Sequence, residues 1–247
     1  MILGIMQPYF FPYIGYWQLM NAVDKYVIAD DLNFIKGGYI NRNRILCNGE
    51  PSYFRLPVQK ISQNKPICEH TIGLDEAEIH KLLQALTCSY KHAPYYDRTF
   101  EHVKEVLDYG LTDEGKNLSV FLENANRKTA EVLGITTPIY VSSRDLKLDD
   151  SYKREFFVVE MCKRMGATEY YNAIGGTKLY CQKFFRENGL GLKFVKTDES
   201  IKYNQYGEDF VPNLSIIDIM MFCSTEESTE LLTRFTLEDG QEEFIET

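Results

Sequence analysis

Two adjacent aspartates and two nearby arginines have the chemistry that a catalytic site requires. Asp30 and Asp31 directly follow the apolar run KYVIA, and Arg42 and Arg44 lie further along the chain. An aspartate at a strand end can position a hydroxyl or an amine or remove its proton, and an arginine binds phosphate through paired N–H groups. We therefore assign Asp30 and Asp31 as candidate catalytic residues, and Arg42 and Arg44 as candidate phosphate ligands. Ordinary surface charge is the alternative explanation.

The segment QPYFFPYIGY, residues 7–16, places five aromatic rings in a stretch that two prolines and a glycine keep irregular. A core strand would not carry the prolines, and an ordinary surface loop would not carry so many rings. An amide, tyrosine hydroxyls and a glycine at the start of a helix favour a phosphate or a sugar-nucleotide pyrophosphate. The predicted ligand-binding residues of this aromatic loop are Gln7, Pro8, Phe11, Tyr13, Gly15 and Tyr16. The alternative is that the rings plug the end of a sheet as core.

A second candidate phosphate-binding turn is IGGTKLY, residues 174–180. Gly175 and Gly176 follow a strand pattern and precede a helical pattern, with Lys178 beside them. A glycine pair at the carboxyl end of a strand can hold phosphate, although a plain turn has the same signature. The segment 142–144, Ser-Ser-Arg, is a third turn of this kind. We expect the glycine pair, the aromatic loop and the two arginines to meet in one pocket.

Histidine and cysteine do not form a metal-binding pattern. All four histidines lie between residues 70 and 102, and the six cysteines are widely spread without a Cys-x-x-Cys pair. The spacings Cys68-x-His70 and Cys88-x3-His92 do not match those of zinc sites. We therefore predict no metal site, histidines on solvated helix faces, and reduced cysteines. The sequence identifies no cofactor.

Alternating strand and helix patterns position these candidates. Strand patterns occupy residues 2–6, 25–29, 138–141, 169–173 and 192–195, and helical patterns occupy 14–23, 152–165, 178–187 and 215–222. Short strand-helix-strand units form parallel sheets that bind ligands at the carboxyl ends of their strands. The sequence therefore predicts one α/β domain over residues 1–247, with a Rossmann-like, mostly parallel sheet. A β-hairpin at 39–58 and a helical insertion at about 75–134 complete it.

The charge distribution limits the classes of partner. The net charge is −9, and residues 226–247 carry eight acids and one base, which predicts an acidic, solvated tail at about 225–247. The rest of the chain is nearly neutral, which argues against a nucleic-acid partner. A small-molecule nucleotide or sugar nucleotide fits better. An anionic ligand could use the first basic group, Lys36, Arg42 and Arg44, or the second, Arg144, Lys147, Lys153 and Arg154.

Targeting signals are not found in the sequence. No apolar run reaches the length of about 18 residues that a membrane span needs, and the N-terminus lacks the basic region of a signal peptide. We therefore expect a cytoplasmic protein without a membrane span. The sequence does not indicate an oligomeric state.

The start of the chain also resembles a nucleotidyltransferase-type fold. In that fold, a His-x-Gly-His motif opens the helix after the first strand and binds nucleotide phosphates. The corresponding stretch here is Tyr13-Ile14-Gly15-Tyr16, in which both histidines are replaced by tyrosine. The replacement removes the groups that stabilise charge on a transferring phosphate, so the resemblance extends to the fold and not to adenylyl transfer.

Several stretches resemble the WbqC-like family over the whole chain. They are QPYFFPYIGYWQL (7–19), DKYVIADD (24–31), NRNRI (41–45), IGGTKLY (174–180) and FVPNLSIIDIMMF (210–222). The resemblance implies a bacterial protein that helps to build the O-antigen, a surface polysaccharide. It assigns no catalytic residues. We expect a transferase that modifies the amine or hydroxyl of a nucleotide-activated or lipid-linked sugar, with a non-catalytic sugar-nucleotide or glycan-binding scaffold as the alternative.

Overall fold

A six-stranded sheet runs through the molecule, and all its neighbouring strands are parallel except β7 and β8. The computed structural model describes residues 1–148, 155–207 and 209–243. The strand order is β5-β2-β1-β6-β7-β8. The strands are β1 (Ile2–Met6), β2 (Lys25–Ile28), β5 (Ile139–Val141), β6 (Glu169–Ala173), β7 (Gly191–Thr197) and β8 (Phe235–Glu238). The predicted α/β fold with a mostly parallel sheet is confirmed.

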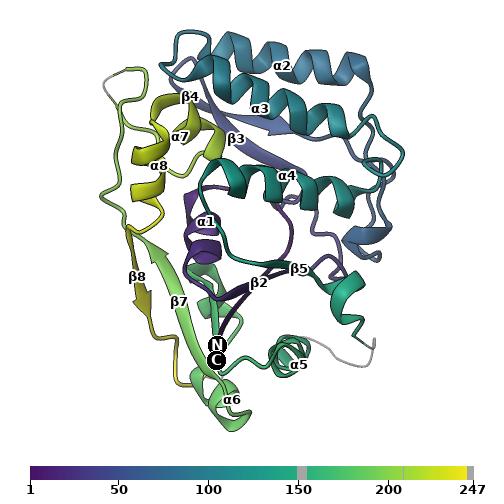
Figure 1. Cartoon of the computed structure of the whole chain (residues 1–247), viewed down its shortest axis with the longest axis vertical. Coiled ribbons are helices and arrows are strands. Elements are labelled where there is room, and N and C mark those ends of the chain that lie inside the picture. Colours follow the sequence, from purple (N-terminus) through teal and green to yellow (C-terminus); the bar gives the residue numbers. More distant parts are fainter. Residues whose placement is uncertain (149–154, 208, 244–247) are drawn as a thin grey trace.

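Helices cover both faces of this sheet, because successive side chains of a strand point to opposite faces. Leu3 and Ile5 of β1 belong to one apolar cluster with side chains of α5 (Glu155–Met165) and α6 (Gln182–Glu187). On the other face, α1 (Ile14–Asn21) packs against β6 and β7. Figure 1 shows α5 and α6 at the end of the molecule opposite to the helices α2 (Glu76–Tyr90) and α3 (Tyr96–Tyr109). This two-sided arrangement is the one expected for a Rossmann-like sheet.

The predicted hairpin is present as a separate two-stranded sheet. It consists of β3 (Arg42–Cys47) and β4 (Glu50–Arg55). Asn48 and Gly49 connect the strands with positive φ angles of 52° and 80°. Two central residues with positive φ give a turn whose twist matches that of the paired strands, and Asn-Gly is the dipeptide that adopts it most easily.

Helices from two parts of the chain form a layer beside the hairpin (Figure 1). They are α2 (Glu76–Tyr90), α3 (Tyr96–Tyr109), α4 (Leu118–Val132), α7 (Ile216–Phe222) and α8 (Thr225–Leu231). The predicted cap Ser215 accepts a hydrogen bond from the Ile217 N–H of α7 at 3.3 Å. Three short helical turns, η1 (Ile67–Glu69), η2 (Ser142–Leu146) and η3 (Ile174–Lys178), complete the described elements.

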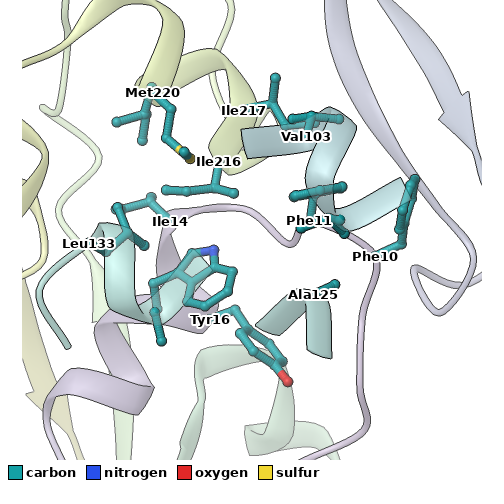
Figure 2. Packing of buried hydrophobic residues seen from close by; sticks show 14 of the residues in the cluster. Phe10, Phe11, Ile14, Tyr16, Val103, Ala125, Leu133, Ile216, Ile217 and Met220 are labelled. Atoms are coloured by element: carbon teal, nitrogen blue, oxygen red, sulfur yellow. The ribbon is translucent and has the colours of Figure 1, made fainter. Parts of the chain in front are cut away.

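Much of the aromatic loop lies in the core between α1 and this helical layer. Phe10 and Phe11 are almost fully buried. Figure 2 shows them close to Val103 of α3, with Ile217 of α7 on the same side. Hydrogen bonds hold the loop at both rings: the Phe10 N–H donates to the Tyr39 carbonyl at 3.1 Å, and the Phe11 carbonyl accepts from the Ser215 hydroxyl at 2.7 Å. Burial of two phenyl rings stabilises the fold by about 2 kcal/mol each. For these two rings, the alternative that the aromatic loop contributes to the core is therefore correct.

The acidic segment after residue 225 is largely folded, and most of its described acidic side chains are exposed to solvent. It forms α8 and β8, and β8 pairs antiparallel with β7. The acids pair with lysines of β7: Asp239 lies 2.7 Å from Lys193, and Glu238 lies 2.8 Å from Lys196. Composition alone identified the acids but could not show that a lysine-bearing strand would lie beside them.

Other sequence predictions differ in detail. The helix expected from residue 178 begins at Gln182, because η3 occupies residues 174–178. The start of the helix expected at 152–165 lies outside the described residues, as do Lys153 and Arg154 of the second basic group. Within the described ranges, no helix combines the length and apolar character needed to cross a bilayer.

Two histidines are buried, which corrects their predicted placement on solvated helix faces. His70 accepts from the Ser62 N–H through Nε2 at 3.2 Å, and its Nδ1 lies 2.8 Å from the Pro66 carbonyl oxygen. His102 of α3 is 8% exposed, and its Nε2 lies 3.0 Å from the Thr129 hydroxyl. Burial lowers the pKa of His102 to about 4. The helical pattern placed His102 on a polar face, but α4 packs against that face.

We expect the burial of His102 to make the fold sensitive to acid. His102 stays neutral in the native state down to about pH 4, whereas the unfolded chain protonates it below about pH 6.5. Its contribution is therefore fully present above pH 6.5 and is lost as the pH falls toward 4. Between pH 7 and pH 5 the expected loss is about 2 kcal/mol. Urea unfolding at both pH values measures it. His102→Gln should remove most of this difference, and an unchanged difference would show that other groups cause it.

Candidate functional site

The larger of two adjacent cavities lies at the point where the strand order of the sheet reverses. In the strand order, β2 and β6 flank β1, so the chain leaves β1 on one side and returns on the other. A crevice forms at the carboxyl ends of strands at such a switch point, and ligands of open α/β sheets bind there. The cavity has a volume of about 810 Å³. Residues from the ends of β1, β2 and β6, from η3 and from α5 line it.

Apolar walls and a few polar groups characterise this larger cavity. Ile5, Ala29 and Phe157 contribute to the walls, and the polar lining side chains are Gln7, Asn172, Glu155, Lys178 and the tyrosines 9, 170 and 180. The Gln7 amide donates to the Asn33 carbonyl at 3.3 Å, which holds the side chain at the end of β1. Apolar walls with few polar groups are typical of small-molecule sites of this size.

The two glycines of η3 have different steric roles. A Cβ on Gly176 would lie 2.6 Å from the Asn172 amide nitrogen and 3.2 Å from the Phe194 ring. Gly176 therefore allows η3 to pack closely on β6. A Cβ on Gly175 would meet nothing within 4 Å, and Gly175 lines the larger cavity. The structure thus brings Gly175, Gly176 and Lys178 together with Gln7.

The smaller cavity adjoins the larger one through a shared residue, Tyr9. Its volume is about 360 Å³, and its lining residues are Tyr9, Pro12, Tyr13, Tyr39, Asn43, Arg44 and Asn213. Burial, together with the nearby hydroxyls of Tyr13, Tyr39 and Tyr180, raises the pKa of Tyr9 to about 12. Tyr180 lines the larger cavity, so the Tyr9 hydroxyl lies near phenols of both cavities.

The two candidate arginines have different surroundings. Arg44 lines the smaller cavity, and its Nη2 donates to the Asn213 carbonyl at 3.1 Å. Arg42 donates to the carbonyls of Gly37 and Gly38, and its guanidinium lies 4.5 Å from the centre of the Tyr53 ring. Arg42 therefore holds the connection before β3 and lines neither cavity.

The two candidate aspartates also differ. Asp30 is 2% exposed, and its carboxylate accepts from the Ser119 and Ser143 hydroxyls at 2.5 and 2.8 Å and from the Ser143 N–H at 3.0 Å. Asp31 is half-buried and accepts from the Ser142 hydroxyl at 2.5 Å. Neither lines a cavity, although the chain positions on either side of the pair, Ala29 and Leu32, both line the larger one. Asp30 thus joins the end of β2 to α4 and η2.

Four predicted residues of the aromatic loop line neither cavity. They are Pro8, Phe11, Gly15 and Tyr16. A Cβ on Gly15 would lie 2.5 Å from the Tyr13 hydroxyl, so the Tyr13 ring occupies the space that we expected a ligand to use. Tyr16 is buried and donates to the Gln7 carbonyl at 3.3 Å, which supports the end of β1. Instead of the single pocket that we expected, the structure has two neighbouring cavities, and these four residues are not among those that line them.

Several lining residues were not singled out from the sequence. The sequence pattern indicated Asn172 only as part of the strand at 169–173. An amide side chain near the end of a strand, just before a glycine pair, is nevertheless a usable signal. Tyr180 and Tyr39 had no local signal, because strand order and loop packing place them. Among the described residues, no three or more His, Cys, Asp or Glu side chains are grouped so that they could hold a metal ion.

Comparison with known proteins gives a match over most of the chain. The model of the WbqC-like protein family matches residues 7–230. A protein of Mycobacterium tuberculosis, described as the uncharacterized protein Rv1507c, is 27% identical over 225 residues. That alignment covers 90% of this chain and 94% of the relative. No solved structure matches the chain significantly.

Proposed function

Since the chain belongs to the WbqC-like protein family, we propose that it is a transferase of bacterial surface-polysaccharide (O-antigen) biosynthesis. Its substrate would be a nucleotide-activated or lipid-linked sugar, and it would modify an amine or a hydroxyl of that sugar. The observation that carries the proposal is the larger cavity at the switch point between β1 and β6. Its volume of about 810 Å³ suits a ligand of the size of a sugar nucleotide.

The lining chemistry supports a sugar with an attached phosphate. The amides of Gln7 and Asn172 have donors and acceptors that suit sugar hydroxyls, and the half-buried Tyr180 ring offers a stacking surface. Lys178, beside the glycine pair, supplies positive charge for a phosphate. Ile35 and Leu179 line the same cavity with exposed apolar side chains, which suits a lipid-linked sugar as well.

Asp31 is the better candidate for proton transfer. Asp30 is buried and its carboxylate accepts hydrogen bonds from Ser119, Ser142 and Ser143, whereas Asp31 is half-buried and its carboxylate accepts a short hydrogen bond from Ser142. In the proposed reaction, Asp31 takes the proton from the attacking amine or hydroxyl. The new bond forms at the transferred group, and the leaving group departs with the electron pair of the broken bond. Asp30 acts through position, by fixing the end of β2.

A second candidate function is a non-catalytic scaffold that binds a sugar nucleotide or a glycan intermediate. The half-buried rings of Tyr9 and Tyr180 at one cavity favour it, since aromatic surfaces bind sugars without a need for turnover. Binding and turnover therefore have to be measured separately.

The test is a thermal-shift screen followed by a product assay. Nucleotides, sugar nucleotides and free sugars are compared, and the correct ligand at about a hundred times its Kd should raise the melting temperature by about 5–10 °C. Asp31→Asn should keep this shift and lower product formation at least about a hundredfold. A shift without any product, in the wild type and with every donor tried, would favour the scaffold. No shift with any sugar nucleotide would contradict a nucleotide-activated substrate.

A further inference from the structure

Arg44 lines the smaller cavity and has an unpaired guanidinium N–H. Its Nε is buried and has no hydrogen-bond partner among the described residues, and the ion pairs found there do not include Arg44. Within the part of the chain that the structure describes, the acceptor found for its side chain is the Asn213 carbonyl, which accepts from Nη2. A buried donor without a partner destabilises the empty site, so a ligand that accepts from it gains affinity by removing that cost. The geometry therefore favours an acceptor in the cavity.

Tyrosine side chains line the same cavity as this guanidinium. Tyr9, Tyr13 and Tyr39 line the cavity, and the Tyr9 and Tyr39 rings are in edge contact with centroids 6.2 Å apart. The pKa of Tyr13 is raised by burial and by Tyr39, so the Tyr13 phenol is protonated at neutral pH. A protonated phenol donates a hydrogen bond to an anion. Among the described residues that line the cavity, none has a carboxylate that would compete for these donors.

The cavity is formed in advance by the surrounding chain. The buried Asn43 side chain donates to the Phe11 carbonyl at 2.8 Å and accepts from the Arg44 N–H at 2.9 Å, which fixes β3 against the aromatic loop. Gly15 leaves space for the Tyr13 ring over the first turn of α1. A site that needs little rearrangement loses less free energy to ordering when it binds.

We propose that the smaller cavity is an oxyanion subsite, in which Arg44 and the hydroxyls of Tyr9, Tyr13 and Tyr39 bind a carboxylate or a phosphate. The shared residue Tyr9 places this anion next to the group held in the larger cavity. The inference deepens the proposed function and rests on it in one respect: the anion belongs to a substrate of the same reaction. It is either the phosphate of the activated sugar or the carboxylate of the second substrate.

Nuclear magnetic resonance of the full chain tests the subsite with two simple anions. The Arg44 Nε–H resonance, assigned by its loss in Arg44→Lys, is followed while inorganic phosphate or acetate replaces chloride at constant ionic strength. We expect a saturable shift with at least one anion. A response to phosphate alone would identify the phosphate source, and a response to acetate alone would identify the carboxylate source. A response to both supports an oxyanion subsite that does not discriminate between them.

Variants separate this subsite from general electrostatics. With the backbone amides of Asn43 and Asn213 as reporters, Arg44→Lys should weaken binding of the active anion by about tenfold, because lysine lacks the planar fork. Arg42→Ala removes a charge two residues away, outside the cavity, and should change the affinity by less than about twofold. Tyr39→Phe should weaken binding by about fivefold.

Two results would overturn the inference. One is the absence of a saturable shift with either anion; the other is an equal loss of affinity in Arg44→Lys and Arg42→Ala. Neither affects binding of a sugar nucleotide in the larger cavity, which the thermal-shift screen measures independently. Conversely, anion binding at Arg44 without any sugar-nucleotide binding would contradict the proposed function and leave the subsite intact.

Discussion

Asp30→Ala is expected to lower the free energy of unfolding by about 3–5 kcal/mol, since it removes a buried charged acceptor from its donors. The carboxylate accepts from the Ser119 hydroxyl, the Ser143 hydroxyl and the Ser143 N–H, all at 3.0 Å or less. Alanine would leave these donors without the acceptor at a position where the native side chain is 2% exposed. Urea unfolding at pH 7 gives the measurement.

Ser119→Ala is the matched control for this experiment. It removes one donor while the carboxylate keeps its bonds to Ser143, so the expected loss is about 1 kcal/mol. Asp30→Asn keeps the shape of the side chain and should fall between the two. If Asp30→Ala costs no more than Ser119→Ala, the carboxylate is not the structural junction between β2, α4 and η2 that its contacts indicate.

Gly175→Trp is expected to lower the affinity for the sugar nucleotide by about a thousandfold, equivalent to about 4 kcal/mol. A side chain on Gly175 meets no protein atom near its Cβ, and the residue lines the larger cavity. Its φ is not among the positive values, so an L-residue fits the backbone without strain. The indole ring would therefore occupy ligand space while the fold is retained. Titration calorimetry with the ligand found in the screen measures the loss.

Gly175→Ala is the control for the blocking variant, and its affinity should stay within about twofold of the wild type. Both variants should unfold at the wild-type urea concentration. Gly176→Ala differs from them because its Cβ would overlap the Asn172 amide, so it should reduce stability and displace a lining residue together. A Gly175→Trp protein that still binds with wild-type affinity would place the ligand outside the larger cavity.

The architecture was predictable from the sequence because its signals are local. Alternating strand and helix patterns gave the parallel sheet, and Asn48-Gly49 gave the hairpin turn, since few other dipeptides adopt two positive φ angles. The cap Ser215 was likewise visible from its position before an apolar helix. Each of these features depends on residues within a few positions of one another.

The details of the site were less predictable because they depend on long-range pairing. In the sequence, Arg42 and Arg44 are equivalent positions of one strand. In the structure, the Arg42 guanidinium donates to the carbonyls of Gly37 and Gly38, and the folding of that loop could not be predicted from the strand pattern. The donors that bury Asp30 come from residues 119 and 143, far along the chain. The glycine pair meets Gln7 because β6 pairs with β1, and no local pattern specifies that neighbour.

The most direct test of the account is a crystal structure of the protein with the sugar nucleotide that raises the melting temperature most. We expect the sugar and its nucleotide to fill the larger cavity between the ends of β1 and β6, within hydrogen-bond distance of Gln7 or Asn172. A ligand bound at any other surface, with the larger cavity unchanged, would contradict the proposed site and with it the proposed function.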